Sequence, residues 1–396
     1  MTVLASPKQE IKFLTIGVLS LAHMFNDLYA NFWPAFLLVV TGLSATRAAI
    51  LVSVFSISSS FVQPIFGYYL DRRGKRWLVH VGTLWMAVLL SLTGFVHSFG
   101  LLVILAALSG LGTAAFHPQA STMVNVSSGN YKAVIMSVFV TCGNIGFALS
   151  PLLLVPLFEN YGLPATGFTV IPGILVALLL LIYSPHNKQL INASAPSFAE
   201  VTQSLRQAAR ELSAIILVIA LRALSYTGLL ALLPLYFRSR NLSPIVGSHL
   251  LTIMLFVGAF GGLAGGFISD RYGRKRLIVG SLILSTPLFF AFFYTQGLIS
   301  NILLGLAGAT LMASFSVTVV AAQEAIPNNK SLAAGITMGM AGGIGNLLVI
   351  PIGHIGDSMG LPTAIVLLFV LPIIAGLAGL LMKSRPATRN QRLAAS

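Results

Sequence analysis

Charged side chains are scarce in this sequence. Asp, Glu, Lys and Arg make up 8% of its 396 residues, whereas hydrophobic residues make up 56%. Soluble domains carry roughly 25% charged residues, so this chain has too few charges to cover a water-exposed surface of its size. The composition excludes an ordinary soluble protein and predicts that lipid is the solvent for most of the surface.

Cysteine and the common catalytic motifs are also missing. Cys142 is the single cysteine, so no internal disulfide can form, and no group of Cys and His residues has the spacing of a metal site. The sequence contains no Walker loop, no His-Glu-x-x-His helix and no nucleophile elbow. We therefore expect no enzyme activity, no bound metal and no cofactor.

Long apolar stretches dominate what is present. A membrane span needs about 20 mostly apolar residues, because the hydrocarbon core is about 30 Å thick. These stretches are apolar throughout instead of alternating as barrel strands do, and a helix pairs its own backbone amides within lipid. We predict an all-α membrane protein with twelve transmembrane helices, at about 12–40, 46–70, 76–97, 99–124, 131–157, 164–184, 212–237, 245–269, 276–296, 299–323, 331–356 and 361–382.

The basic residues are distributed unevenly between the two sides. The net charge is +14, which in a soluble protein would suggest a nucleic-acid partner. If the amino terminus is cytoplasmic, however, the outer loops hold only Arg47, Arg238 and Arg240. Nearly all other basic residues then fall on the cytoplasmic side, as the positive-inside rule requires. We predict a multi-pass protein of the bacterial inner membrane with both termini in the cytoplasm, and no nucleic-acid partner.

The chain contains an internal duplication. The loop at 67–76 recurs at 266–276, and its Asp71 and Asp270 lie 199 positions apart. Gly146 recurs as Gly345 at the same offset. Repeats that keep their order and spacing predict two equivalent halves of six helices each.

The polar stretch between the halves sets the predicted domain boundaries. We expect an N-terminal six-helix bundle at 1–184, a cytoplasmic linker at 185–211 and a C-terminal bundle at 212–396. Within the linker, Ser197 to Glu200 reads as a capping box that opens a short surface helix through Leu212. A linker without a helix is the alternative.

The repeated loop resembles the signature of the major facilitator superfamily, which implies two pseudo-symmetric bundles that rock about a central site. The resemblance implies that Asp71 faces the start of span eleven near Ser331 and closes the cytoplasmic side, and that Asp270 acts likewise near Tyr131. Loops that serve only topology and stability are the alternative. The expected gate residues are Gly67, Asp71, Arg72, Gly74, Arg76, Gly266, Asp270, Arg271, Gly273 and Arg276.

One carboxylate and one arginine lie well inside predicted spans, where a charge costs roughly 2.5–3.5 kcal/mol and usually marks function. Asp27 is in span one, with His23 one helical turn before it. We expect Asp27 to load and release protons; a permanently bonded structural carboxylate is the alternative. Arg222 is in span seven, the repeat of span one. It could face Asp27, bind an anionic substrate or extend toward the cytoplasm.

Further polar residues are candidates for the same pathway. His117, before Pro118 in span four, could relay protons, bind substrate or simply be packed. Glu324, at the inner end of span ten, could couple protons or cap its helix. Hydrogen-bonding side chains that could serve as ligands or hold helices together are Asn26, Gln63, Gln119 and Asn144.

These positions narrow the resemblance to the fosmidomycin-resistance-protein family of major facilitator exporters. The matching stretches are His23-x-x-Asn26-Asp27, Gln63-Pro64-x-x-Gly67-Tyr68, Phe116-His117-Pro118, Gly143-Asn144-x-Gly146 and Gln323-Glu324-x-x-Pro327. The resemblance implies a secondary transporter that exports a drug-like or small organic molecule in exchange for protons, as a functional monomer in the lipid bilayer.

One departure keeps the transport direction open. Drug/proton antiporters of the superfamily often carry a Gly-Pro pair in span five, but Gly146 and Pro151 are separated here. Uptake of a small organic metabolite, by proton coupling or facilitated diffusion, is the alternative.

Overall fold

The chain folds entirely into helices over the residues that the structure describes. The computed structural model describes residues 12–73, 77–128, 132–185, 198–327, 333 and 336–384. Its helices are α1 Phe13–Ala30, α2 Phe32–Val39, α3 Ala45–Arg73, α4 Trp77–Ser91, η1 Thr93–Phe95, α5 Phe99–Ser127, α6 Lys132–Tyr161, η2 Leu163–Thr169, α7 Val170–Tyr183, α8 Phe198–Gln207, α9 Ala209–Ser239, α10 Pro244–Tyr272, α11 Arg274–Tyr294, α12 Gly297–Ala325, η5 Ile336–Ala341, α14 Gly342–Leu347, α15 Val349–Met359 and α16 Leu361–Gly379.

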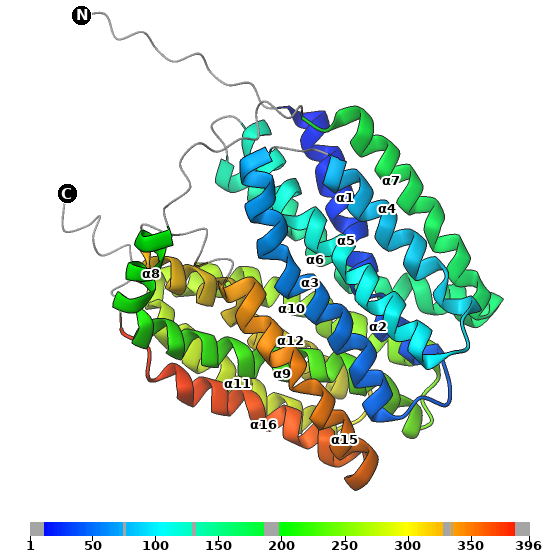
Figure 1. Ribbon diagram of the computed structural model, residues 1–396. Coiled ribbons are helices and arrows are strands. Elements are labelled where there is room, and N and C mark those ends of the chain that lie inside the picture. The colour runs from blue at the N-terminus through cyan, green and yellow to red at the C-terminus, as the bar shows by residue number, and fades with distance from the viewer. Residues whose placement is uncertain are drawn as a thin grey trace, which may run out of the picture.

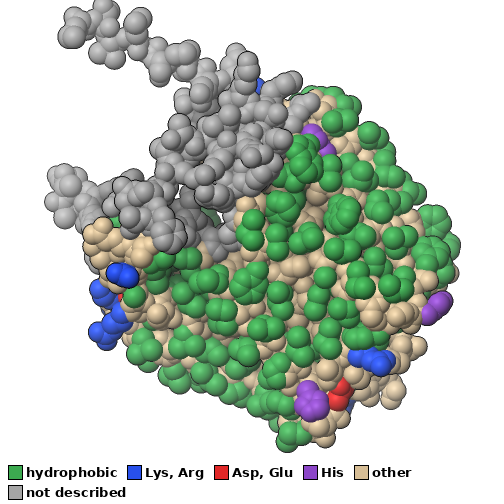
Figure 2. Space-filling view, in the orientation of Figure 1, with side chains coloured by type: hydrophobic (Ala, Val, Ile, Leu, Met, Phe, Trp, Pro, Cys, Tyr) green, Lys and Arg blue, Asp and Glu red, His purple; other side chains and the backbone are tan. Residues whose placement is uncertain are grey.

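Twelve helical segments of this part of the chain are long and apolar enough to cross a membrane, which confirms the predicted number of spans. Large hydrophobic side chains such as Phe267 and Leu298 are exposed on the outside of the bundle. Figure 2 shows hydrophobic side chains covering the visible face, while charged side chains gather near its ends. Such a surface suits contact with lipid.

The first and eleventh spans are not single continuous α-helices. The first consists of α1 and α2, which meet at Asn31, and the Asn31 side chain donates to the Phe147 carbonyl at 2.9 Å. The eleventh begins as the π-helix η5 and continues through α14 and α15. The expected surface helix is α8, which ends at Gln207 instead of Leu212; Ser197 lies outside the described residues.

The helices pack mainly in two sets (Figure 1). In the first, α1 packs on α5, α6 and α7, and α3 packs on α5. In the second, α9 packs on α14 and α16, α10 on α12, and α11 on α12 and α16. The sets meet chiefly where α6 contacts α10 and where α3 contacts α15. The domain boundaries at 184 and 212 stay a prediction.

Glycines of the repeat make the same contact in both sets. A Cβ on Gly146 of α6 would collide with the Met24 carbonyl of α1, and a Cβ on Gly345 of α14 would collide with the Ala220 carbonyl of α9. Only glycine allows backbones to approach so closely. The close packing of spans one and five therefore returns in spans seven and eleven, as the duplication predicts.

Two polar contacts join the sets at one end of the molecule. We call the end with the α10–α11 loop the basic face and the other the opposite face. On the opposite face, the Asp357 carboxylate at the end of α15 accepts from the amides of Ala45 at 2.7 Å and Thr46 at 3.0 Å, at the start of α3. The Arg238 guanidinium of α9 donates to carbonyls at the end of α2, including that of Leu38 at 2.7 Å. A carboxylate on a helix N-terminus and a cation on a C-terminus complement the helix dipoles, so these contacts join the two sets at the opposite face.

The first prediction concerns these contacts. Asp357→Ala removes the acceptor at the start of α3, which costs about 1 kcal/mol and favours states in which the opposite face is open. A cysteine placed at the buried residue Ala49, in a Cys142→Ser background, should react about fivefold faster with a bulky maleimide.

The neighbouring change Ser358→Ala is the control, because the Ser358 hydroxyl bonds within its own helix. Equal labelling of the Asp357→Ala and parent proteins would show that the contact does not hold this face.

Candidate functional site

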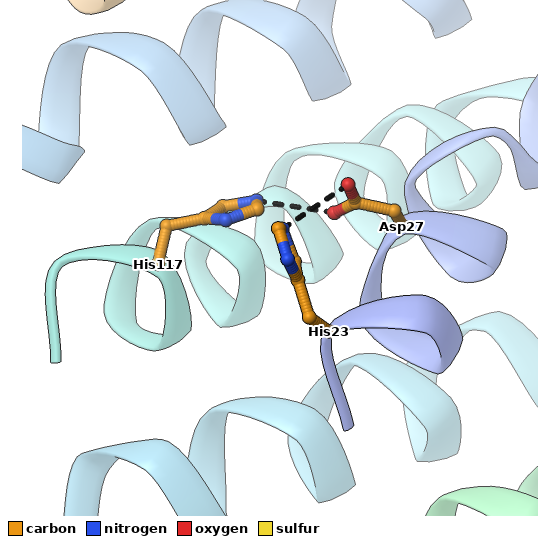
Figure 3. A group of neighbouring side chains, drawn as sticks. All are labelled: His23, Asp27 and His117. Carbon is orange, nitrogen blue, oxygen red and sulfur yellow. Dashed lines mark ion pairs between the residues drawn. The ribbon is translucent and has the colours of Figure 1, made fainter. Parts of the chain in front are cut away.

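Three ionisable side chains meet inside the first set of helices. His23 and Asp27 project from one face of α1, and His117 projects from α5 (Figure 3). Nε2 of His23 lies 3.3 Å from one carboxylate oxygen of Asp27, and Nε2 of His117 lies 3.3 Å from the other. Each oxygen therefore has its own imidazole partner.

One contact fixes the orientation of the His23 ring. Nδ1 of His23 lies 2.8 Å from the Phe139 carbonyl, which can only accept, so this nitrogen carries a hydrogen. Nε2 then faces Asp27 at 3.3 Å. A proton shared at that contact makes the pair either an imidazolium beside a carboxylate or an imidazole beside a carboxyl group.

The cluster faces the protein interior. The side chains of His23, Asp27 and His117 are 7%, 15% and 25% exposed. The His23 ring stacks on Phe139, with centroids 4.0 Å apart. The ligand atoms of the three residues lie within 4.8 Å of one another, close enough to share one small cation.

Arg222 of α9 is buried in the second set of helices. It is 4% exposed, and its Nε has no hydrogen-bond partner. The guanidinium carbon lies 4.7 Å from the centre of the Phe315 ring of α12. Arg222 forms no direct ion pair with Asp27 among the described residues. Tyr226 lies one turn after Arg222 on α9, and its ring stacks on Phe147 of α6, with centroids 6.5 Å apart.

The structure distributes the amide candidates among different environments. Asn26 is fully buried and its amide atoms have no partner, and Gln119 is buried as well. Gln63 and Asn144 are partly exposed. The hydrogen bonds of the described residues show no contact of Asn26 with the His23–Asp27–His117 cluster.

Glu324 and the second copy of the repeated loop come together at the basic face. Arg274 reaches Glu324, with Nε 3.4 Å from the carboxylate, and also pairs with Asp270. Gly273 has φ +96°, a conformation that favours glycine, at the junction of α10 and α11. Gly266 has open space beside it, so it makes no close helix contact.

The expected gate contacts fall on residues that the structure does not describe. Gly74, Arg76, Tyr131 and Ser331 lie outside the described residues, as do the side chains of Asp71 and Arg72 and the surroundings of Gly67. Arg271 and Arg276 are exposed at the basic face, and Arg271 lies over the Tyr272 ring.

Aromatic partners were missed in the sequence, although the repeat marks two of them. At the offset of 199, His23 corresponds to Arg222, Asp27 to Tyr226 and Phe116 to Phe315. The Phe116 ring lies 6.0 Å from His23, just as Phe315 lies against Arg222. The duplication therefore places two equivalent half-sites in the protein, one with a carboxylate and one with a phenol.

Comparison with known proteins identifies the class. A polytopic helical bundle with buried ionisable groups is the architecture of a membrane transporter, not an enzyme. The family model described as Major Facilitator Superfamily matches residues 15–349, and the chain belongs to this superfamily.

Individual relatives agree with this assignment. The chain is 30% identical to the "Uncharacterized MFS-type transporter YfnC" of Bacillus subtilis, over 92% of this chain and 91% of that protein. It is 27% identical to the "Fosmidomycin resistance protein" of Escherichia coli, over 98% and 96% of the two chains. In fold it resembles the nucleoside transporter NupG, with TM-score 0.76 at 15% identity, over 93% and 100% of the chains.

The second prediction tests the packing under the cluster. A Cβ on Gly143 of α6 would lie 2.5 Å from both Asp27 Oδ2 and His23 Cε1, whereas a Cβ on its repeat partner Gly342 meets nothing within 4 Å. Gly→Ala in a helix normally stabilises by about 1 kcal/mol. Gly342→Ala should therefore raise the thermal unfolding temperature in detergent, and Gly143→Ala should lower it because the methyl group displaces the cluster. An equal gain from both changes would contradict the packing described here.

Proposed function

We propose that this protein exports a drug-like or small organic molecule in exchange for protons. The observation that carries the proposal is the buried His23–Asp27–His117 cluster, in which each Asp27 oxygen lies 3.3 Å from an imidazole nitrogen. Imidazole side chains serve widely as proton acceptors and donors. Such a site inside a transporter suits coupling to a proton gradient.

Alternating access supplies the mechanism. The two bundles rock about the site, and proton loading biases the equilibrium between the two open states because the cluster binds the proton differently in each. The Asp357 and Arg238 contacts close the opposite face in one of these states. The loops around Asp71 and Asp270 close the basic face in the other, which we place in the cytoplasm together with both termini.

The remaining polar residues have supporting roles in this proposal. Asn26, Gln63, Gln119 and Asn144 line or brace the path, while Glu324 holds the basic-face loop through Arg274. Export is supported by the name of the fosmidomycin resistance relative, which describes protection from a compound. We place the protein in the bacterial inner membrane as a functional monomer.

One observation favours uptake as a second candidate. An anionic group beside the unpaired Arg222 would repel a bare Asp27 carboxylate and so favour the protonated cluster. Substrate and proton would then enter together. This electrostatic coupling suits co-transport of an acidic metabolite.

The third prediction concerns the proton site. Asp27→Asn should abolish fosmidomycin-driven proton movement in proteoliposomes, because an amide cannot carry the proton between compartments. Glu324→Gln is the matched control and should keep coupling, because Glu324 pairs with Arg274 at the basic face. Coupling that survives Asp27→Asn would remove Asp27 from this role.

The fourth prediction separates the two directions. Overexpression of an exporter should protect a sensitive bacterial host from fosmidomycin, and the Asp27→Asn variant should give no protection. Growth at graded concentrations of the drug measures the effect. Overexpression that instead sensitises the cells would favour uptake and overturn the export proposal.

A further inference from the structure

Arg222 is a buried cation without a counterion among the described residues. It is 4% exposed, and its Nε lacks any acceptor. The described ion pairs of arginine belong to Arg274 at the basic face. Burial of an unpaired charge is costly, so a protein that retains one has a ligand or a partner for it in some state.

The first half-site shows what is missing from the second. His23 has the Asp27 carboxylate one turn later on α1. Its repeat partner Arg222 has Tyr226 at that position on α9, and a phenol supplies no full negative charge. The second half-site therefore has a stronger cation than the first and no protein anion to match it.

The contact that Gly143 makes is absent from the second half-site. In the first, Gly143 of α6 packs directly on His23 and Asp27, whereas a Cβ added to its repeat partner Gly342 would have no neighbouring atom within 4 Å. Because Gly345 packs on α9 as Gly146 packs on α1, we infer from the repeat that this space lies toward Arg222 and Tyr226. Gly342 begins α14, which packs on α9.

The Phe315 ring does not replace a counterion. It lies 4.7 Å from the Arg222 guanidinium, a distance at which a cation and a ring face attract. A guanidinium has five N–H donors, however, and a ring face supplies no lone pair to match a carboxylate oxygen. The ring therefore orients the guanidinium group and leaves its N–H donors available for a ligand.

We propose that Arg222 binds an oxyanion of the transported molecule, with Tyr226 beside it and the space next to Gly342 holding the adjoining part of the substrate. The substrate class is a small organic acid bearing a carboxylate, phosphonate or phosphate, the groups that a guanidinium fork binds through paired hydrogen bonds. This inference rests on the proposed transport function and names the substrate class of that site.

The test is equilibrium binding to the purified full chain in detergent, read as the shift of its thermal unfolding temperature. The probes are phenylphosphonate and benzoate, with benzamide and benzylamine as neutral and cationic counterparts. The oxyanions should stabilise the protein and the counterparts should not. Arg222→Gln should weaken oxyanion binding by about 10- to 100-fold, the usual worth of a charge-assisted hydrogen bond, while Arg222→Lys should keep part of it.

Two further variants guard against a folding defect. Gly342→Leu leaves Arg222 in place and should block the oxyanions by filling the open space. Arg210→Gln removes an exposed arginine from the same helix and should leave oxyanion binding unchanged. Oxyanions that bind no better than benzamide, or whose binding survives both Arg222→Gln and Gly342→Leu, would overturn the proposal.

The outcome of this binding test does not depend on the outcome of the transport test. Binding in detergent requires no proton movement, so loss of oxyanion binding in Arg222→Gln can be observed whether or not Asp27→Asn uncouples transport. Failure of this inference would likewise leave the proton site of the first half untouched.

Discussion

The structure depends on how an ionisable group is kept inside a protein that is dissolved in lipid. A carboxylate away from water is tolerated only when hydrogen-bond donors replace its hydration. Asp27 obtains two such donors, from His23 on its own helix and from His117 on α5. The Phe139 carbonyl of α6 then fixes the His23 ring. The buried Asp27 carboxylate therefore depends on the positions of three helices. A change in the packing of the first bundle would also change the environment of this carboxylate.

The spans could be predicted from the sequence because lipid selects composition over long windows. An apolar run of about 20 residues identifies a span without knowledge of its neighbours. The interruptions could not be predicted in the same way. The break at Asn31 is stabilised by a hydrogen bond to Phe147, 116 residues away, and the π-helix at Ile336–Ala341 lies where α3, α9 and α12 all contact it. These features follow from tertiary contacts that no local pattern contains.

The candidate site could also be predicted only in part from the sequence. His23 and Asp27 could be paired from the sequence because residues four apart share a helical face. His117 joins them only through the packing of α5 on α1, so its role stayed open at that stage. Glu324 had two possible roles, and its contact with Arg274 depends on the fold of the α10–α11 loop. The sequence left three roles open for Arg222, and the contact with the Phe315 ring depends on the packing of α12 on α9.

In the exchange mechanism that we propose, divergence of the two half-sites lets a duplicated fold bind two unlike cargoes. Each half keeps a neutral group beside its charge when the charged partner leaves. When the cluster gives up its proton, the His117 imidazole can still donate from Nε2 to the Asp27 carboxylate. When an anion leaves Arg222, the Phe315 ring remains against the guanidinium. Neither charge is then stripped of every favourable contact, so states that hold only a proton or only a substrate remain accessible during rocking. Identical acidic half-sites would instead place two carboxylates in one low-dielectric cavity, where mutual repulsion would favour retention of a proton and weaken its exchange for substrate.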